Sequence, residues 1–391
     1  MLLRALSLFV VSTPLSAQTT WTVCASGGAQ FSTLAAAVAV AADGDTIVCL
    51  PPQFGTELTG FTTNKGVTIV GGAGPWAIPI RADAASPIVV HGLPAGRSFR
   101  MAGFQFIQDG QLRIDVQSCQ GHVHIEDIGA RDFDFFFPNG PSVVVANSAS
   151  VTLRAIATFG MPALRIDSSR VVVERCGLGV PLAGLRGGSG LVVVASEVDL
   201  AQCVVDTGSM SLGPNLYVPA IDATNSIVRI GGDANARVSG GASGAPGGIP
   251  VVANGGSVSV DPLVVLQPGL GQPLFSGTGV FATISTPATW TSSAMRGQSL
   301  ELRTSGPAGA VVFQAVGVAG PLLATSLGTL GVDLGQPCSF LAAASPGVQG
   351  SVSASIPVPA WLPLGSAFAA QSALAVGGQL LLSSPASFVV L

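Results

Sequence analysis

Apolar and variable residues alternate in short triplets that recur along the middle of the chain. In each triplet an apolar residue, a variable residue and a second apolar residue follow one another, as in the VTI at Val67. This period of two is typical of a β-strand with one buried face. The triplets begin at Val67, Phe99, Val123, Val151, Val171, Val198, Val228 and Val258.

The spacing of the triplets predicts a solenoid. It ranges from 20 residues (Val151 to Val171) to 32 residues (Val67 to Phe99), which is typical of stacked repeats. Turn-forming residues precede four of the later triplets by four positions: Asn147, Asp167, Thr224 and Asn254. Five residues after a triplet begins, a second inward column is expected at Phe104, Ile128, Ile156, Cys176, Cys203 and Leu263. We therefore predict an all-β fold, a parallel β-helix over residues 18–275.

The segment before the first triplet has the pattern of a cap. Leu34, Ala37, Val38 and Ala41 share one apolar stripe of a short helix, for which Ser32 is a suitable N-cap. Asp43–Asp45 then form a turn, and short apolar strands follow. A helix here would cover the first coil, whose unpaired backbone groups would otherwise invite edge-to-edge association.

The six cysteines allow several pairings. If strand 21–24 pairs beside strand 46–49, Cys24 and Cys49 lie at equivalent strand ends, and this is the disulfide that we favour. Closing that loop would stabilise the fold by about 3–4 kcal/mol. Cys176 and Cys203 are either a disulfide or two stacked thiols, and we favour thiols.

The first residues have the pattern of an export signal. Arg4 precedes an apolar run, and small residues at Ser16 and Ala17 follow it, so residues 1–17 read as a secretory signal peptide. The run is too short to cross a bilayer, and no later segment has the length of a transmembrane helix. We therefore expect a secreted protein, exported to the extracellular space or the cell surface.

Composition excludes two classes of protein. Charged residues make up only 9% of the chain and its net charge is -4, so no dense basic face is available to bind nucleic acid. Hydrophobic residues reach 48%, which argues against disorder.

The opening motifs resemble a known family. Phe31, Leu34 and Ala37, then DGDTI at 43–47, with Pro51, Glu57, KGVTI at 65–69 and Gly71, are similar to the N-terminal end of pectin-lyase-like right-handed parallel β-helix proteins. That superfamily includes pectin esterases, pectate lyases and polygalacturonases. The resemblance implies a right-handed helix, with catalytic groups on outward positions of consecutive coils. The segments that carry catalysis in those enzymes are missing here.

Residues 282–391 have a different pattern. Short apolar segments separated by Gly and Pro turns predict a small β-sandwich. The run WLPLGSAFAAQSALAVGG at 361–378 resembles a C-terminal module of large secreted bacterial proteins, which implies sorting, anchoring or carbohydrate contact. The alternative is a capping sandwich with no function of its own.

The strongest candidate for chemistry is a column of outward residues. Glu126, Arg154 and Glu174 occupy equivalent positions of consecutive coils, about 4.8 Å apart, with His124 beside them. Such a column offers acid–base groups, with Arg154 steering an acidic sugar. It is also what an ion-pair ladder looks like, and the ladder is the interpretation that we favour.

Two further clusters of side chains have the composition of a metal or catalytic site. His122, His124 and Glu126 share one strand face, as zinc ligands do, but neighbours on a flat strand seldom converge on one ion. Asp132 and Asp134 suit calcium binding or glycoside chemistry, but a coil edge with Phe133 and Phe135 inward explains them too. We expect no metal and no cofactor, with calcium as the one option.

Two functions follow. The first is a non-catalytic extracellular or cell-surface protein that is structural, adhesive or glycan-binding. The second is a divergent lyase or glycoside hydrolase acting on acidic polysaccharide. For either, we expect a monomer whose partners are extracellular polysaccharide or cell-surface components. In the enzyme hypothesis, catalysis would fall to His124, Glu126, Arg154, Asp132 and Asp134.

Overall fold

The fold is given by a computed structural model of the chain. The predicted signal peptide and both Asp132 and Asp134 lie outside the residues that it describes. The described residues are 18–53, 56–72, 78–106, 112–130, 140–179, 188–207, 218–240, 248–336, 338–344, 346 and 350–391.

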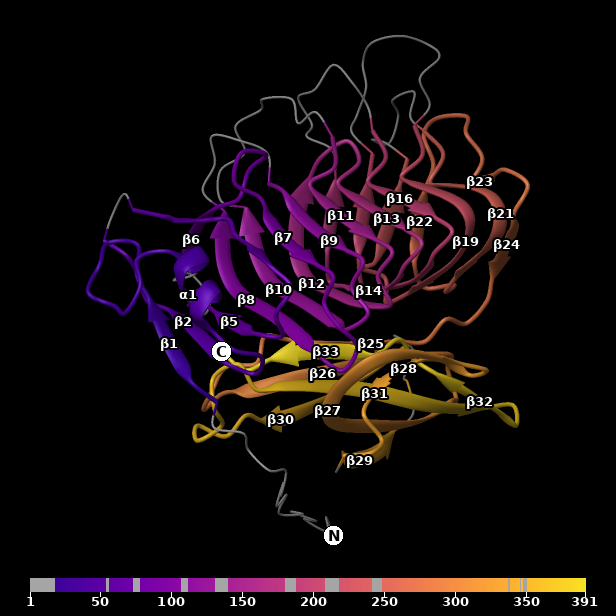
Figure 1. Cartoon of the computed structure of the whole chain (residues 1–391). Coiled ribbons are helices and arrows are strands. Elements are labelled where there is room, and N and C mark those ends of the chain that lie inside the picture. Colours follow the sequence, from indigo (N-terminus) through magenta and orange to yellow (C-terminus); the bar gives the residue numbers. More distant parts are fainter. Residues whose placement is uncertain are drawn as a thin grey trace.

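A parallel β-solenoid of about 8 turns forms the first part of the chain (Figure 1), which confirms the predicted class. Each complete coil has up to three strand positions, which we name faces A, B and C in chain order. Face A holds β4 (Thr62–Thr63), β7 (Ile88–His91), β9 (Ile114–Gln117), β11 (Val143–Ala146), β13 (Leu164–Asp167), β16 (Leu191–Val194), the first halves of β19 (Ile221–Gly231) and β21 (Val251–Val260), and β23 (Phe275–Ser276).

Face B carries the predicted triplets, and face C follows it. Face B holds β1 (Thr20–Val23), β2 (Thr46–Cys49), β5 (Thr68–Val70), the first halves of β8 (Ser98–Phe106), β10 (His122–Ala130) and β12 (Ser150–Phe159), β14 (Arg170–Glu174), β17 (Glu197–Ala201), the second halves of β19 and β21, and β24 (Val280–Thr283). Face C holds β3 (Leu58–Thr59), β6 (Ile78–Arg81), the second halves of β8, β10 and β12, β15 (Gly177–Gly179), β18 (Val204–Asp206), β20 (Arg237–Ser239) and β22 (Val265–Gln267).

The triplets stack in register, as their alternation predicted. Val123 of β10 lies between Phe99 of β8 and Val151 of β12, and all three are fully buried. Their side chains form part of one continuous apolar core inside the coils. Burying this column from coil to coil is the main force that holds the solenoid together.

The second inward column differs from the prediction at its end. Ala236 and Val264 are its last members, because Arg237 pairs with Val265, and Leu263 is only partly buried. A turn closed by Asp261, whose carbonyl accepts from the amide of Val264 at 3.0 Å, shifts the strand by one residue. Leu263 was therefore the wrong choice.

The helix caps the first coil as expected, but from a different N-cap. Helix α1 (Leu34–Val40) begins after Thr33, whose hydroxyl accepts from the amide of Ala36 at 3.2 Å, so Ser32 is not the cap. At the other end, the ammonium of Lys65 donates to the carbonyls of Val38, Ala39 and Ala41 at 2.7–2.9 Å. A cation at this end stabilises the helix dipole and explains why the lysine is there.

The predicted Cys24–Cys49 disulfide is wrong. Both cysteines are free thiols, and the strand register pairs Cys49 with Val23 rather than with Cys24. The one-residue offset places Cys24 beyond the end of β1, where its sulfur lies 3.2 Å from the hydroxyl of Ser26. Cys176 and Cys203 are buried free thiols one coil apart, as favoured.

Two antiparallel sheets follow the solenoid and pack against each other. Leu300 and Leu302 of one sheet share an apolar core with Phe368 and Phe388 of the other. The first sheet holds β25 (Ala288–Thr291), β26 (Ser299–Ser305) and β30 (Ser351–Pro357). The second holds β27 (Val311–Thr325), β28 (Gly328–Val332), β29 (Cys338–Ala344), β31 (Ala367–Val376), β32 (Gln379–Leu382) and β33 (Ala386–Val389).

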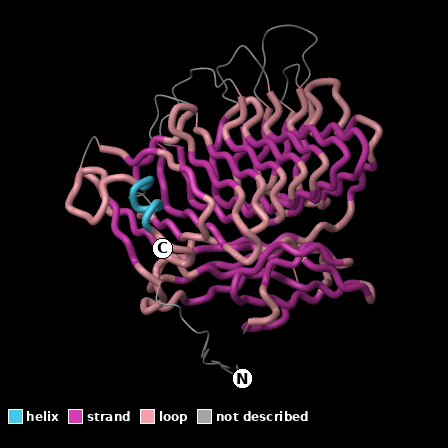
Figure 2. Tube along the Cα trace, in the orientation of Figure 1, coloured by secondary structure: helices cyan, strands magenta, loops and turns pink. Residues whose placement is uncertain are grey.

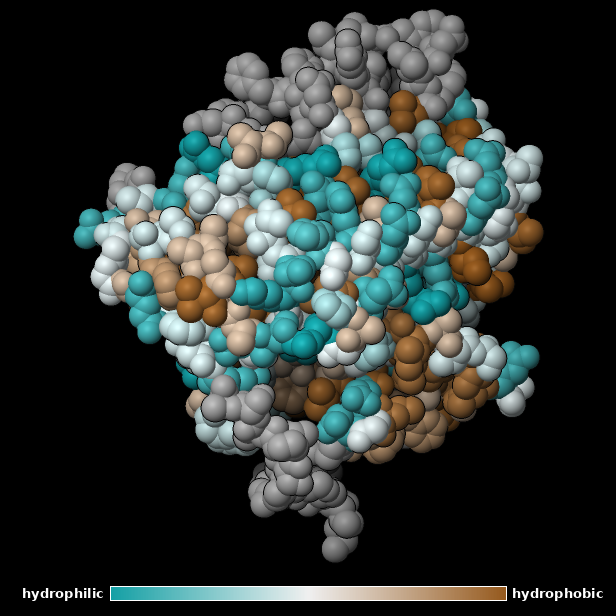
Figure 3. Space-filling model, in the orientation of Figure 1, coloured by the Kyte–Doolittle hydropathy of each residue, from teal (hydrophilic) through white to brown (hydrophobic). Residues whose placement is uncertain are grey.

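This sandwich lies along the solenoid rather than beyond its last coil. Its strands run beneath the row of coils, so the chain turns back after β24 (Figures 1 and 2). Hydrogen bonds join it to face B from β10 to β17. Apolar residues gather on the visible surface of the sandwich, whereas the solenoid above shows a mixed polar surface (Figure 3). From β10 to β17, the outward side of face B is therefore an interface with the sandwich.

Candidate functional site

The predicted column exists on face B. Glu126 pairs in register with Arg154, and Arg154 with Glu174. The Arg154 guanidinium lies 2.5 Å from Glu126 Oε1 through Nη1 and 3.2 Å from Glu174 Oε1 through Nε. His124 Nε2 lies 2.6 Å from Glu126 Oε2. Four outward side chains of three coils thus form one connected polar cluster.

The sandwich seals this cluster. Arg154 and Glu126 are fully buried and His124 is 2% exposed. Arg154 Nη2 donates to the carbonyls of Thr291 and Ser292 at 2.9 and 2.6 Å. In return, Glu174 Oε1 accepts from the amide of Thr291 at 2.8 Å. No substrate can reach the column while the sandwich is docked.

A second anchor lies at the other end of the column. Glu126 Oε2 accepts from the backbone amide of Val389, in β33, at 2.8 Å. The two carboxylates therefore each accept one N–H from the sandwich, and the guanidinium between them donates to two of its carbonyls. Hydrogen bonds and opposite charges of this kind offset the cost of burying Arg154 and Glu126, whereas Glu174 Oε2 is buried without a partner.

Burial shifts the pKa values of the column. Desolvation, and then the nearby charge of Arg154, lowers the pKa of His124 to about 3, so this imidazole is neutral and donates its Nε2 proton to Glu126. Desolvation raises the pKa of Glu174 to about 7, although Arg154 opposes the shift. Burial alone would lower the pKa of Arg154, but Glu126 and Glu174 raise it. The guanidinium is therefore the permanent charge of the cluster.

The other predicted site residues are not brought together. His122 lies on the same strand as His124, with ring centroids 6.3 Å apart, and its Nδ1 is bound to the hydroxyl of Ser150 at 2.7 Å. Across the described ranges, no three His, Cys, Asp or Glu side chains converge in a way that would hold a metal. Asp132 and Asp134 fall outside those ranges, so their role stays a prediction.

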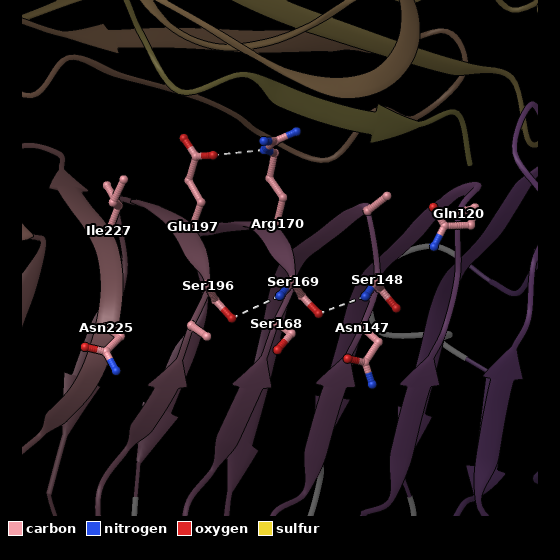
Figure 4. A pocket seen from close by; sticks show the side chains of 12 residues that line it. Gln120, Asn147, Ser148, Ser168, Ser169, Arg170, Ser196, Glu197, Asn225 and Ile227 are labelled. Atoms are coloured by element: carbon pink, nitrogen blue, oxygen red, sulfur yellow. Dashed lines mark hydrogen bonds and ion pairs between the residues drawn. The ribbon is translucent and has the colours of Figure 1, made fainter. Parts of the chain in front are cut away.

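A groove that the sequence patterns did not reveal runs beside the interface. It follows the corner between faces A and B over successive coils and has a volume of about 680 Å³ (Figure 4). At about 4.8 Å per coil, the five corners that line it span about 19 Å. Its residues are Gln120, Asn147, Ser148, Ala149, Ser168, Ser169, Arg170, Ala195, Ser196, Glu197, Asn225 and Ile227.

Stacked serines form the floor of the groove. Each hydroxyl donates to a carbonyl of its own coil. It also accepts from a backbone amide of the preceding coil, as Figure 4 shows for Ser169 and Ser196. Ser196 Oγ, for example, donates to the carbonyl of Val194 at 2.6 Å and accepts from the amide of Ser169 at 3.0 Å. The ladder continues through Ser148, Ser169, Ser196 and Ser226. It satisfies corner amides that a tight turn would leave without a partner.

Removing one of these stacked serine hydroxyls should lower the stability of the solenoid. Ser196→Ala leaves the amide of Ser169 without an acceptor, and we expect a loss of about 1–3 kcal/mol in the free energy of unfolding, measured by urea denaturation. The exposed Ser326→Ala is the matched control and should change stability by less than about 0.5 kcal/mol. Equal stability of the two variants would contradict a structural role for the ladder.

Residues that line the groove on either side of the serines offer contacts for a ligand. The amide side chains of Asn147 and Asn225 lie on exposed residues at its wall, and Ile227 adds an apolar surface that is 45% exposed. The lining holds one cation and one anion, Arg170 and Glu197, which pair at 3.0 Å, so the lining itself has no net charge, and Glu197 also pairs with Arg229 outside the groove. Amides that both donate and accept, beside an apolar surface, suit a polyhydroxylated neutral ligand.

A weak signal for the groove was present in the sequence. Asn147, Ser168 and Asn225 take a positive φ of 46–51° at their corners, and small polar residues tolerate this conformation. Ser169, Ser196 and Ser226 each stand two residues before a triplet. A search for polar residues at a fixed distance from the triplets would have found the ladder. The groove itself depends on how the coils stack.

The fold and the site describe a parallel β-solenoid whose face B is covered by a β-sandwich. An open polar groove runs beside the interface between the two. No family model and no curated protein matches the chain. Within the described residues, no helix has the length and apolar character needed to span a bilayer.

Proposed function

We propose that this protein is a non-catalytic, exported glycan-binding protein that uses the groove at the A–B corner. One observation carries the proposal: the acid–base column is sealed by the sandwich, while a long polar groove beside it is open. The predicted signal peptide supports export. The opening motifs support kinship with the pectin-lyase-like superfamily, in which a shared fold does not imply a shared activity.

The lining of the groove points to the kind of glycan. Arg170 and Glu197 neutralise each other, so the groove has no excess positive charge to attract an acidic polymer. Its length over several coils suits an extended chain of sugars rather than a single ring. We therefore expect a neutral, linear polysaccharide, lying along the row of coils.

A binding and turnover panel tests this function. The protein, residues 18–391, is incubated with immobilised neutral and acidic polysaccharides, and both retention and new reducing ends are scored. Retention by a neutral polymer without turnover is expected. Turnover that is lost in His124→Ala would instead support the enzyme, and would require the sandwich to move away from face B.

One variant pair assigns the binding to the groove. Ala149 is exposed in the groove, so Ala149→Trp should fill it and lower retention by at least tenfold. Ala84→Trp places the same side chain at an exposed position outside the groove and should bind as the wild type does. Equal retention of both variants would overturn the assignment.

A further inference from the structure

Arg100 differs from the other arginines on face B. It occupies the outward position of its triplet in β8, and its guanidinium makes no ion pair or hydrogen bond with any described residue. Its Nε is buried without a partner, although the residue as a whole is partly exposed. Desolvation lowers the pKa of Arg100 to about 10, because no carboxylate offsets the cost of burying its charge.

The neighbouring cations show what is missing. Arg154 is held between Glu126 and Glu174, and Arg229 pairs with Glu197 and Asp199 at 2.6 and 2.8 Å. A charged donor that is buried without a partner is costly, so a folded protein nearly always provides one. Around Arg100 the described chain does not provide it.

His122 is a second unpartnered donor next to Arg100. The hydroxyl of Ser150 already accepts from the amide of Leu322 at 2.7 Å, so its own proton is free to point at His122 Nδ1, 2.7 Å away. The imidazole proton then lies on Nε2, which is buried without a partner. His122 is 3% exposed. A buried N–H with no acceptor is rare in folded proteins, so we expect an acceptor that the chain itself does not supply.

The two donors are neighbours on the outward side of face B. Arg100 pairs in register with His124, and His122 lies two residues before His124 on the same side of the strand. The Arg100 charge is close enough to lower the pKa of His122, after the larger effect of burial. The sandwich contacts the coils on both sides of these donors, with Leu322 at Ser150 and Gly365 against Thr68.

We propose that Arg100 Nε and His122 Nε2 bind a small monovalent anion, with the chemistry of chloride, between the solenoid and the sandwich. Both groups are donors, so the occupant must be an acceptor. One positive charge lacks a counter-charge, which a single negative charge supplies. Sulfate carries two negative charges and would exceed the single cation, whereas a halide matches it. This inference is independent of the proposed glycan binding.

Crystals of the protein grown in sodium bromide test the site directly. We expect an anomalous bromide peak within hydrogen-bonding distance of both Arg100 Nε and His122 Nε2. A water molecule there, or no density at all, would overturn the proposal.

Unfolding measurements provide a second, solution test. The unfolding midpoint of the wild type should rise with chloride or bromide at constant ionic strength set by gluconate, because a ligand of the folded state stabilises it. Arg100→Met should lose this halide dependence and be at least as stable as the wild type in gluconate alone. Arg165→Met, which removes an exposed arginine of face A, should keep the dependence. A wild type that is insensitive to halide would contradict the site.

Discussion

Replacing Arg154 with methionine is expected to lower the free energy of unfolding by about 3–5 kcal/mol. The substitution leaves Glu126 and Glu174 buried without their cation, and it leaves two carbonyls of the sandwich without a donor. Breaking a buried ion pair by removing one partner is costly because the remaining charge has no access to water. Urea denaturation, followed by circular dichroism, measures the change.

Arg165→Met is the matched control for this experiment. Arg165 also pairs with a carboxylate, Asp167 at 2.8 Å, but its side chain is 47% exposed. Water can replace the lost partner there, so we expect a change of at most about 1 kcal/mol. If the two variants lose the same stability, the column does not hold the interface. Thr286 lies between the solenoid and the sandwich. Faster proteolysis there in Arg154→Met would show that the substitution weakens the contact between them.

Acid should destabilise the protein through His124. Its pKa is about 3 in the folded protein and about 6.5 when unfolded. Between these values the unfolded chain binds a proton that the folded protein does not, so stability is lost as the pH falls from 6.5 towards 3. The loss is about 1.4 kcal/mol per pH unit, or roughly 4–5 kcal/mol in all. Unfolding free energies measured from pH 7 to pH 4 would show most of it.

A variant separates this effect from the rest of the molecule. His124→Gln keeps a donor for Glu126 but cannot bind a proton, so the stability difference between wild type and variant should shrink or reverse as the pH falls. His91→Gln, at the exposed histidine of β7, is the control and should follow the wild type. A difference between wild type and His124→Gln that does not change with pH would contradict the burial of a neutral imidazole.

Glu174 acts in the opposite direction. Its pKa of about 7 in the folded protein lies above its ordinary value of 4.5. The folded protein therefore keeps a proton that the unfolded chain has released, and stability is lost as the pH rises from 4.5 to 7. The wild-type profile between these values sums these opposed slopes with those of other buried groups, such as His122, whose pKa burial lowers. For this reason the comparison of variants is more informative than the wild-type curve alone.

The solenoid was predictable because its cause is local and repeated. Alternation within each triplet marks a strand, and recurrence of the triplet marks a coil, so both features can be read from neighbouring residues. Errors arose where the register depends on a turn. Leu263 is displaced from the column by the turn at Asp261, and Cys24 is displaced from Cys49 by one residue in the pairing of β1 with β2.

The alternation also placed Glu126, Arg154 and Glu174 in one outward column, and the register confirms it. The sequence by itself determined this periodic architecture, because each coil repeats the same alternation of buried apolar and outward residues. Only the tertiary structure decided that the column faces the sandwich. Its partners, Thr291 and Val389, lie far along the chain, and no periodic pattern links them to face B. Outward residues look alike in sequence whether water or a second domain covers them, because only the docking of the two parts removes the solvent.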